Sequence, residues 1–119
     1  IGNFSDCNFL PMVDARRMEV YCSHFDYDLN EIEKTEAIIL NEESILRWKN
    51  YKRIICGGDG TIKAKELLST LINIEFSDNI IPSAKWLETL AYKKYLNKDF
   101  ASVAYAEPNY AKEFYEGKK

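Results

Sequence analysis

Hydrophobic and polar positions alternate along the N-terminal third of the chain with the period of two that is typical of β-strands. The alternation predicts strands at residues 9–13, 19–25 and 32–40, with turn-forming residues at 26–30. Pro11 lies inside the first strand. Because proline has no amide hydrogen to donate, we expect that strand at a sheet edge or locally irregular. Three strands in succession favour an antiparallel meander.

After residue 40 the pattern changes to the spacing of helices, interrupted by short apolar strands. Asn41 is a suitable N-cap for a first helix, and residues 53–56 predict a fourth strand. A second helix is expected over residues 61–71, a further short strand over 72–76 and the longest helix over 84–96. The order strand-strand-strand-helix-strand-helix-(strand)-helix predicts an α/β fold with a mixed sheet.

The composition fits one domain with a core of its own. The chain has 119 residues, 46% of them hydrophobic, a formal net charge of -3 and a pI of about 5.2. We expect a single domain over residues 1–119 and no direct nucleic-acid binding, which normally leaves a basic footprint. No apolar stretch approaches the roughly 20 residues that cross a bilayer, so no membrane contact is expected.

Three cysteines, Cys7, Cys22 and Cys56, form no C-x-x-C pair and are odd in number. They are typical of reduced thiols in a cytoplasmic protein rather than of a disulfide framework. Cys22 and Cys56 lie in predicted strands, where we expect them to be buried. The first residue is Ile1 rather than Met, which indicates a processed start or a piece of a longer polypeptide.

Charged residues gather where the first strand gives way to the second: Asp14, Arg16 and Arg17. Tight hairpins usually turn on Asn-Gly or Asp-Gly, and this corner contains neither. Since unpaired charges beside a core are costly, the corner needs either mutual pairing or an outside partner. The first alternative is an Asp–Arg pair that fixes the turn, and the second is a binding surface.

A glycine cluster follows the fourth strand and precedes a helix: Gly57, Gly58, Asp59 and Gly60. Backbone amides in such a place can hold a phosphate. The cluster matches neither of the common glycine-rich phosphate motifs, and Asp59 puts a negative charge where the phosphate would lie. A tight strand-to-helix turn that needs a positive φ is the favoured alternative.

His24 is the only histidine, and no partner accompanies it at metal-ligand spacing. We expect it to be a half-buried strand residue, and we expect no metal site and no catalytic residue. Four aromatic residues lie near the C-terminus: Tyr105, Tyr110, Phe114 and Tyr115. They could stack on bases, although packing against protein is the favoured alternative at this pI.

Residues 11–21, P-M-V-D-A-R-R-M-E-V-Y, closely resemble the P-M-[IV]-D-A-R-x-x-E-V-Y motif of the bacterial TsaB family, also called YeaZ. Three further segments are similar to family segments and follow in the same order. They are the strand-to-glycine turn, the start of the last long helix and an E-P-x-Y tail. In this sequence they occupy residues 56–60, 82–84 and 105–110, and the tail residues are Glu107, Pro108 and Tyr110.

The resemblance implies the two-lobed fold of the actin, sugar-kinase and Hsp70 class (ASKHA), with this chain as the C-terminal lobe and the N-terminal lobe absent from it. TsaB proteins are non-catalytic partners of TsaD. That transferase places a threonylcarbamoyl group on the adenosine beside the anticodon of tRNAs that read codons starting with A, and the ATPase TsaE completes the system. By this resemblance the chain is not an enzyme and has no cofactor, since ATP and metal belong to the partner subunits.

The family motif also assigns roles to residues. The charged corner, which faces the cleft between the lobes, is expected to shape that cleft or a regulatory contact; it comprises Asp14, Arg16, Arg17, Glu19 and Tyr21. The glycine cluster corresponds to the loop that holds nucleotide in active relatives. A lobe without its companion is expected to expose an apolar face and to self-associate, with the tail around Tyr110 and Phe114 as the candidate surface.

Two other functions are considered. The chain could be the nucleotide-binding lobe of an active kinase or acyltransferase of the same fold, acting through the glycine cluster and Asp14. It could also be a peptidase, the label often attached to this family, but metal-dependent proteolysis needs a ligand set that these residues do not offer. The leading hypothesis is a scaffold that binds TsaD-like and TsaE-like proteins.

Overall fold

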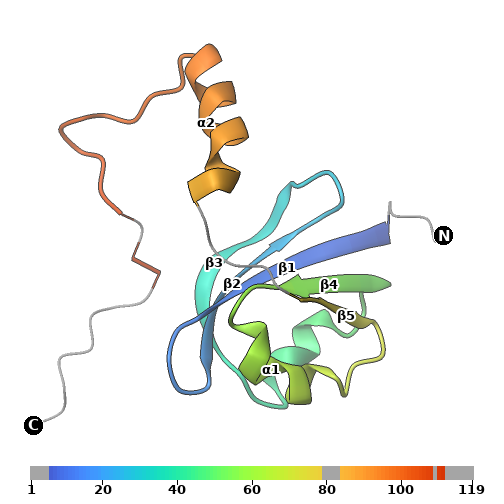
Figure 1. Ribbon diagram of the computed structural model, residues 1–119. Helices are drawn as coiled ribbons and strands as arrows, with labels where there is room; N and C mark the ends of the chain where they lie inside the picture. The colour runs from blue at the N-terminus through green and yellow to red at the C-terminus, as the bar shows by residue number, and fades with distance from the viewer. Residues whose placement is uncertain (1–5, 79–83, 109, 112–119) are drawn as a thin grey trace, which may run out of the picture. The chain divides into compact units, whose positions relative to one another are not determined.

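The computed structural model describes residues 6–78, 84–108 and 110–111. These form two compact units, of which the first contains residues 6–78 and 111 and the second residues 84–108 and 110. The first unit is a β-sheet with short helices, and the second is built around one longer helix (Figure 1). The expectation that residues 1–119 form a single lobe of a larger fold stays a prediction.

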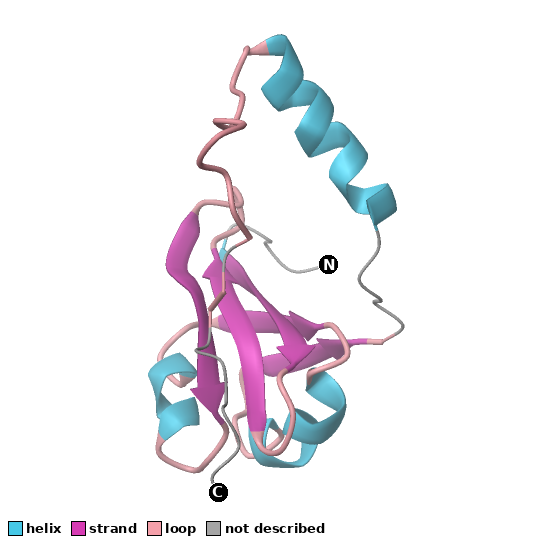
Figure 2. Cartoon of the chain, turned by 90° about the vertical axis from the view of Figure 1, so that its left-hand side faces the viewer, coloured by secondary structure: helices cyan, strands magenta, loops and turns pink. Residues whose placement is uncertain are grey.

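A mixed sheet with strand order β3-β2-β1-β4-β5 is the framework of the first unit (Figure 2). The pairs β1–β2 and β2–β3 are antiparallel, whereas β1–β4 and β4–β5 are parallel. The predicted meander and the mixed α/β character are therefore confirmed. The strands are β1 (Cys7–Asp14), β2 (Glu19–Phe25), β3 (Glu31–Ile39), β4 (Arg53–Gly57) and β5 (Ile74–Ser77).

The helices of the described residues are η2 (Ser44–Trp48), α1 (Thr61–Leu68), η3 (Ala84–Trp86) and α2 (Leu87–Leu96). The helix predicted after Asn41 is a 3-10 helix. The expectation of Asn41 as its N-cap is wrong, because the N-cap is Glu43, which makes no side-chain capping hydrogen bond. Asn41 Oδ1 instead accepts a hydrogen bond from the Ser44 amide at 2.7 Å in the turn that leads into the helix. Helix α1 ends before residue 71, since the Ser69 and Thr70 hydroxyls bond to carbonyl groups of its last turns.

Pro11 lies in the central strand of the sheet, so the expectation of an edge strand is wrong. On the β4 side Pro11 is in parallel register with Gly57. On the β2 side the paired positions pass from Phe9 directly to Met12. This local interruption of the ladder accommodates a residue that has no amide hydrogen to donate, as the second alternative from the sequence allowed.

The core of the first unit lies between the sheet and the helices η2 and α1, and both cysteines expected to be buried belong to it. Desolvation raises the pKa of Cys56 to about 12 and also raises the pKa of Cys22, so both remain neutral thiols. The core residues are Leu10, Met12, Val20, Cys22, Ile38, Leu40, Ile45, Trp48, Ile54, Cys56, Ala64, Leu68 and Ile74.

The second unit is organised around α2, in which no described residue is buried. The chain turns after this helix at Lys98, whose φ is 54°. There Tyr95 packs edge-on against Phe100, with ring centroids 6.1 Å apart. The expected helix start at Pro82 lies outside the described residues, as do Phe114 and Tyr115. Across the described ranges, no helix is both long and apolar enough to cross a membrane.

Candidate functional site: the charged corner and its groove

A lysine from helix α1 holds the charged corner at the end of β1. Lys63 Nζ donates to Asp14 Oδ1 at 2.6 Å and to the carbonyl oxygen of Arg17 at 2.5 Å. The same carboxylate oxygen accepts a hydrogen bond from the Arg16 amide at 2.7 Å. These bonds favour the charged carboxylate and lower the pKa of Asp14, with the Lys63 hydrogen bond as the main cause.

The Asp–Arg pair considered from the sequence is wrong, because the ion-pair partner of Asp14 is Lys63. Arg16 and Arg17 instead form a strained turn, with φ values of 71° and 50°. The left-handed conformation costs an L-residue roughly 1–2 kcal/mol, which the bonds from Asp14 and Lys63 offset. Both arginine side chains are exposed, and neither guanidinium is paired within the described residues. The corner therefore presents two available positive charges.

The glycine turn after β4 packs directly against the end of β1. Gly58 has a φ of 106°, as predicted for a tight strand-to-helix turn. A Cβ on Gly58 would lie 2.1 Å from the carbonyl oxygen of Met12, and the Gly60 amide donates to that oxygen at 3.1 Å. Asp59 Oδ1 accepts a hydrogen bond from the Asp14 amide at 2.8 Å. The turn and the charged corner thus form one hydrogen-bonded assembly.

Three backbone amides at the end of the glycine turn and the start of α1 already have partners, beginning with the Gly60 amide on the Met12 carbonyl. The Thr61 amide donates to the Gly58 carbonyl at 3.2 Å, and the Ile62 amide donates to the Asp59 carbonyl at 3.4 Å. An incoming phosphate would have to displace such bonds and approach the Asp59 carboxylate. This geometry is that of a structural turn and does not favour a phosphate cradle.

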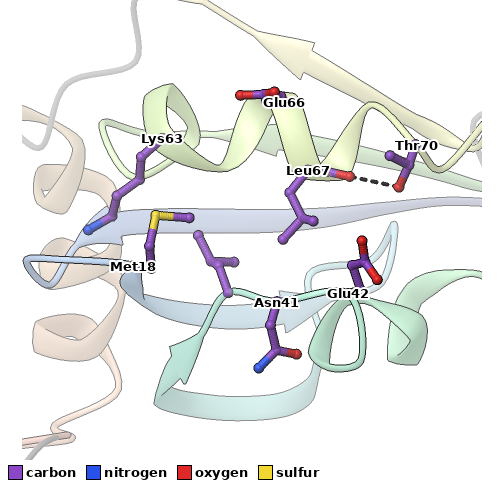
Figure 3. A pocket seen from close by; sticks show the side chains of 8 residues that line it. Met18, Asn41, Glu42, Lys63, Glu66, Leu67 and Thr70 are labelled. Carbon is purple, nitrogen blue, oxygen red and sulfur yellow. Dashed lines mark hydrogen bonds between the residues drawn. The ribbon is translucent and has the colours of Figure 1, made fainter.

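An open groove of about 490 Å³ lies beside the corner (Figure 3). Helix α1 forms one wall, and the β1–β2 loop with the segment after β3 forms the other. The Leu40 amide donates to the Met18 carbonyl at 2.7 Å and so joins the two parts of the second wall. We call this the α1 groove; its residues are Met18, Leu40, Asn41, Glu42, Lys63, Glu66, Leu67 and Thr70.

Apolar side chains form the middle of the α1 groove, and its two ends differ in charge. Lys63 and Met18 lie at one end in Figure 3, and Glu42 and Thr70 lie at the other. The side chain of Leu67 points into the space between them. The groove is therefore suited to an amphipathic partner rather than to a uniformly charged one.

The remaining candidate residues, from the motif at 11–21 and from the tail at 105–110, are distributed over both units. Glu19 closes the turn of the corner, since its amide donates to the Arg16 carbonyl at 3.1 Å. Tyr21 is half-buried and lies opposite Val13 of β1. The tail residues belong to the second unit, in which all three are exposed: Glu107, Pro108 and Tyr110.

His24 is fully buried, so the expectation of a half-buried side chain is wrong. Asn8 Nδ2 lies 2.8 Å from Nε2, and Tyr51 packs edge-on against the ring at 4.6 Å. Nδ1 has no hydrogen-bond partner in the described structure, and its nearest charge is Glu33 at 3.9 Å. Burial lowers the pKa of His24, and the Glu33 carboxylate opposes that shift only in part. The residue is a neutral core histidine.

Sequence reasoning did not single out Lys63 or the α1 groove. A signal was present: Lys63, Glu66, Leu67 and Thr70 follow the i, i+3, i+4, i+7 spacing of one helix face. Because this face combines charged and apolar side chains, it could have indicated a surface of α1 that is partly open to solvent and suited to binding. No three His, Cys, Asp or Glu side chains of the described residues are grouped so as to hold a metal ion.

Comparison with known proteins yields a likeness in structure alone. No family model and no curated protein matches the chain significantly. One similar solved structure is described as an uncharacterized protein with similarity to peptidase YeaZ from Pseudomonas aeruginosa. It has a TM-score of 0.65 and 17% sequence identity, and the match covers 88% of this chain and 49% of that protein. The chain thus shares the fold of about half of a YeaZ-like structure.

Proposed function

We propose that this protein is a TsaB-like, non-catalytic partner of a TsaD-type transferase in the formation of threonylcarbamoyladenosine on tRNA. The observation that carries the proposal is the structural likeness to a YeaZ-like protein over 88% of the chain. The motif resemblance at residues 11–21 supports it independently. In this proposal the chain corresponds to the C-terminal lobe of an ASKHA fold and acts in the cytoplasm.

The geometry of the corner supports a scaffold better than an active site. Asp14, the residue that an enzyme of this fold class would use, is tied to Lys63 and to the Arg16 amide. Asp59 is tied to the Asp14 amide at 2.8 Å, where a nucleotide phosphate would otherwise approach. These groups hold the strand ends together. Exposed Arg16 and Arg17 are then available for contact with a protein partner.

Reconstitution tests the proposal. A tRNA transcript is incubated with TsaD, the threonylcarbamoyl-AMP synthase and TsaE from the same cell, with and without this protein. Formation of modified adenosine that requires the protein, with no ATP turnover by the protein alone, is the expected result. Full product formation without it contradicts the proposal. The double variant Arg16→Gln/Arg17→Gln should reduce product formation, whereas Lys34→Gln, an exposed control on β3, should not.

A further inference from the structure

We infer that the α1 groove is the docking site for an amphipathic helix of a partner protein, which places a lysine or arginine beside Glu42, apolar residues at the centre and an acidic residue beside the Arg16–Arg17 turn. This inference rests on the scaffold role proposed above, because it defines the surface through which a partner would be held.

The carboxylates of the groove are available for a cation. The side-chain carboxylates of Glu42 and Glu66 form no ion pair or hydrogen bond with any described residue. Lys63, the basic residue of the groove, already lies 2.6 Å from Asp14 and so contributes little net positive charge. In Figure 3 Glu42 lies at the Thr70 end of the groove, whereas Glu66 lies on α1 between Lys63 and Leu67. An uncompensated carboxylate such as that of Glu42 beside apolar surface attracts a basic side chain whose stem can pack on that surface, and Glu66 adds negative charge along the α1 wall.

The surroundings increase the negative potential at the Glu42 end. Helix α1 ends at Leu68 on that side, and the carboxyl end of a helix carries a partial negative charge. Residues 6–78 include fourteen acidic and nine basic residues, a net charge of -5 for the first unit. A cationic group is therefore favoured there both by its neighbours and by the wider field.

The opposite end of the groove, where Met18 lies, favours an acidic side chain of the partner. Met18, which lines that end, directly follows the two exposed arginines of the corner. Neither Arg16 nor Arg17 has a charge partner among the described residues. An acidic residue of the partner would complement them. Because the two ends of the groove carry opposite charges, they select both the charge pattern of a partner helix and the direction in which that helix lies.

The centre of the groove offers an apolar surface that one or two side chains of a helix can cover. Met18 is 47% exposed, and Leu67 is partly buried against the core. Leu40 beneath them is buried, which gives the groove a fixed floor. One or two apolar side chains of a helix, spaced i and i+4, would cover these residues. Apolar contact supplies affinity, and the charged ends supply direction and selectivity.

A synthetic helix tests the inference. The probe is a fluorescein-labelled helical peptide of about fifteen residues, with glutamates in its first turn, leucines spaced i and i+4 in the middle, and lysines in its last turn. Binding to the full chain is measured by fluorescence anisotropy at two salt concentrations. We expect saturable binding that weakens with salt, and a Glu42→Gln/Glu66→Gln variant that binds roughly five- to tenfold more weakly.

Two controls make the result specific. Glu43→Gln removes a neighbouring exposed carboxylate that does not line the groove, and it should leave affinity unchanged. A peptide with its lysines and glutamates exchanged should bind wild type poorly and should bind a Glu42→Lys/Glu66→Lys variant better. Absence of saturable binding, or binding insensitive to both Glu42 and Glu66, overturns the inference.

The peptide assay and the reconstitution assay test the groove inference and the scaffold role separately. If tRNA modification depends on the protein but the peptide does not bind, the groove inference is wrong and the scaffold role stands. If the peptide binds through Glu42 and Glu66 but modification proceeds without the protein, the scaffold role is wrong and the groove is a docking site for another partner.

Discussion

The two units of the chain place their apolar residues in opposite ways. In the first unit Trp48 and Leu68 are fully buried between the sheet and the short helices. In the second unit α2 has ten residues, and Leu90 and Tyr95 of this helix are 58% and 65% exposed. A helix of that length is marginal by itself in water. The difference indicates that the hydrophobic core of the described residues lies in the first unit, and that α2 contributes no buried side chain.

The largest effect is expected for removal of the central aromatic of the core. Trp48→Ala should lower the free energy of unfolding by about 3–5 kcal/mol, because it deletes the largest fully buried side chain of the first unit. Chemical denaturation followed by circular dichroism measures the change. A loss below about 1 kcal/mol would show that the core is not where the structure places it.

A substantial loss is also expected at the glycine turn. Gly58→Ala should destabilise the first unit by roughly 1–3 kcal/mol, since the new Cβ meets the Met12 carbonyl oxygen and φ is positive. Ser69→Ala, at an exposed position after α1, serves as the control and should change stability far less. Equal stabilities of the two variants would contradict the close contact between the turn and β1.

A smaller effect, dependent on pH, is expected from His24. Its pKa is lower in the folded chain than in the unfolded chain, so the unfolded chain binds the proton more readily. Stability from this group is complete above the unfolded pKa of about 6.5 and falls as the pH drops below it. Denaturation curves at pH 7.5 and pH 5.5 measure the difference, and His24→Phe should reduce it. An unchanged difference in the variant would assign the pH dependence to other groups.

The smallest effect is expected in the second unit. Leu90→Ala should change the free energy of unfolding of the first unit by less than about 0.5 kcal/mol, because Leu90 is exposed. Leu68→Ala, the same substitution in the core, should cost about 2–5 kcal/mol. If the two variants lost stability equally, the contrast between the units would be wrong.

The strands were predictable from the sequence, whereas the contacts between distant segments were not. Residues 19–25 alternate so regularly that the predicted and observed bounds of β2 coincide. The sequence left two alternatives open for Pro11, an edge strand or a local irregularity, and the structure shows the second. The local rule could not choose between them, because it concerns hydrogen bonding, while strand order depends on the whole sheet. The helix after Asn41 was predicted as α-helical, since caps and apolar spacing do not distinguish a short α-helix from a 3-10 helix.

The candidate site was predictable only in part for the same reason. The sequence marked Asp14 and the glycine cluster separately, and the structure joins them through Asp59. Lys63 lies 49 positions from Asp14 along the chain, so no local sequence pattern predicts their ion pair. The α1 groove draws its walls from three separate segments, which the β1–β4 and β2–β3 pairings bring together.

The contact between the glycine turn and β1 has a consequence for how related sequences can diverge. The atoms that approach Gly58 belong to the backbone of Met12 and not to its side chain. The glycine is therefore required whichever apolar residue occupies position 12, and no compensating exchange there can relieve its loss. In relatives that keep this turn, we expect position 58 to stay glycine, and we expect the apolar residue at position 12 to be limited by the packing of the core rather than by this contact.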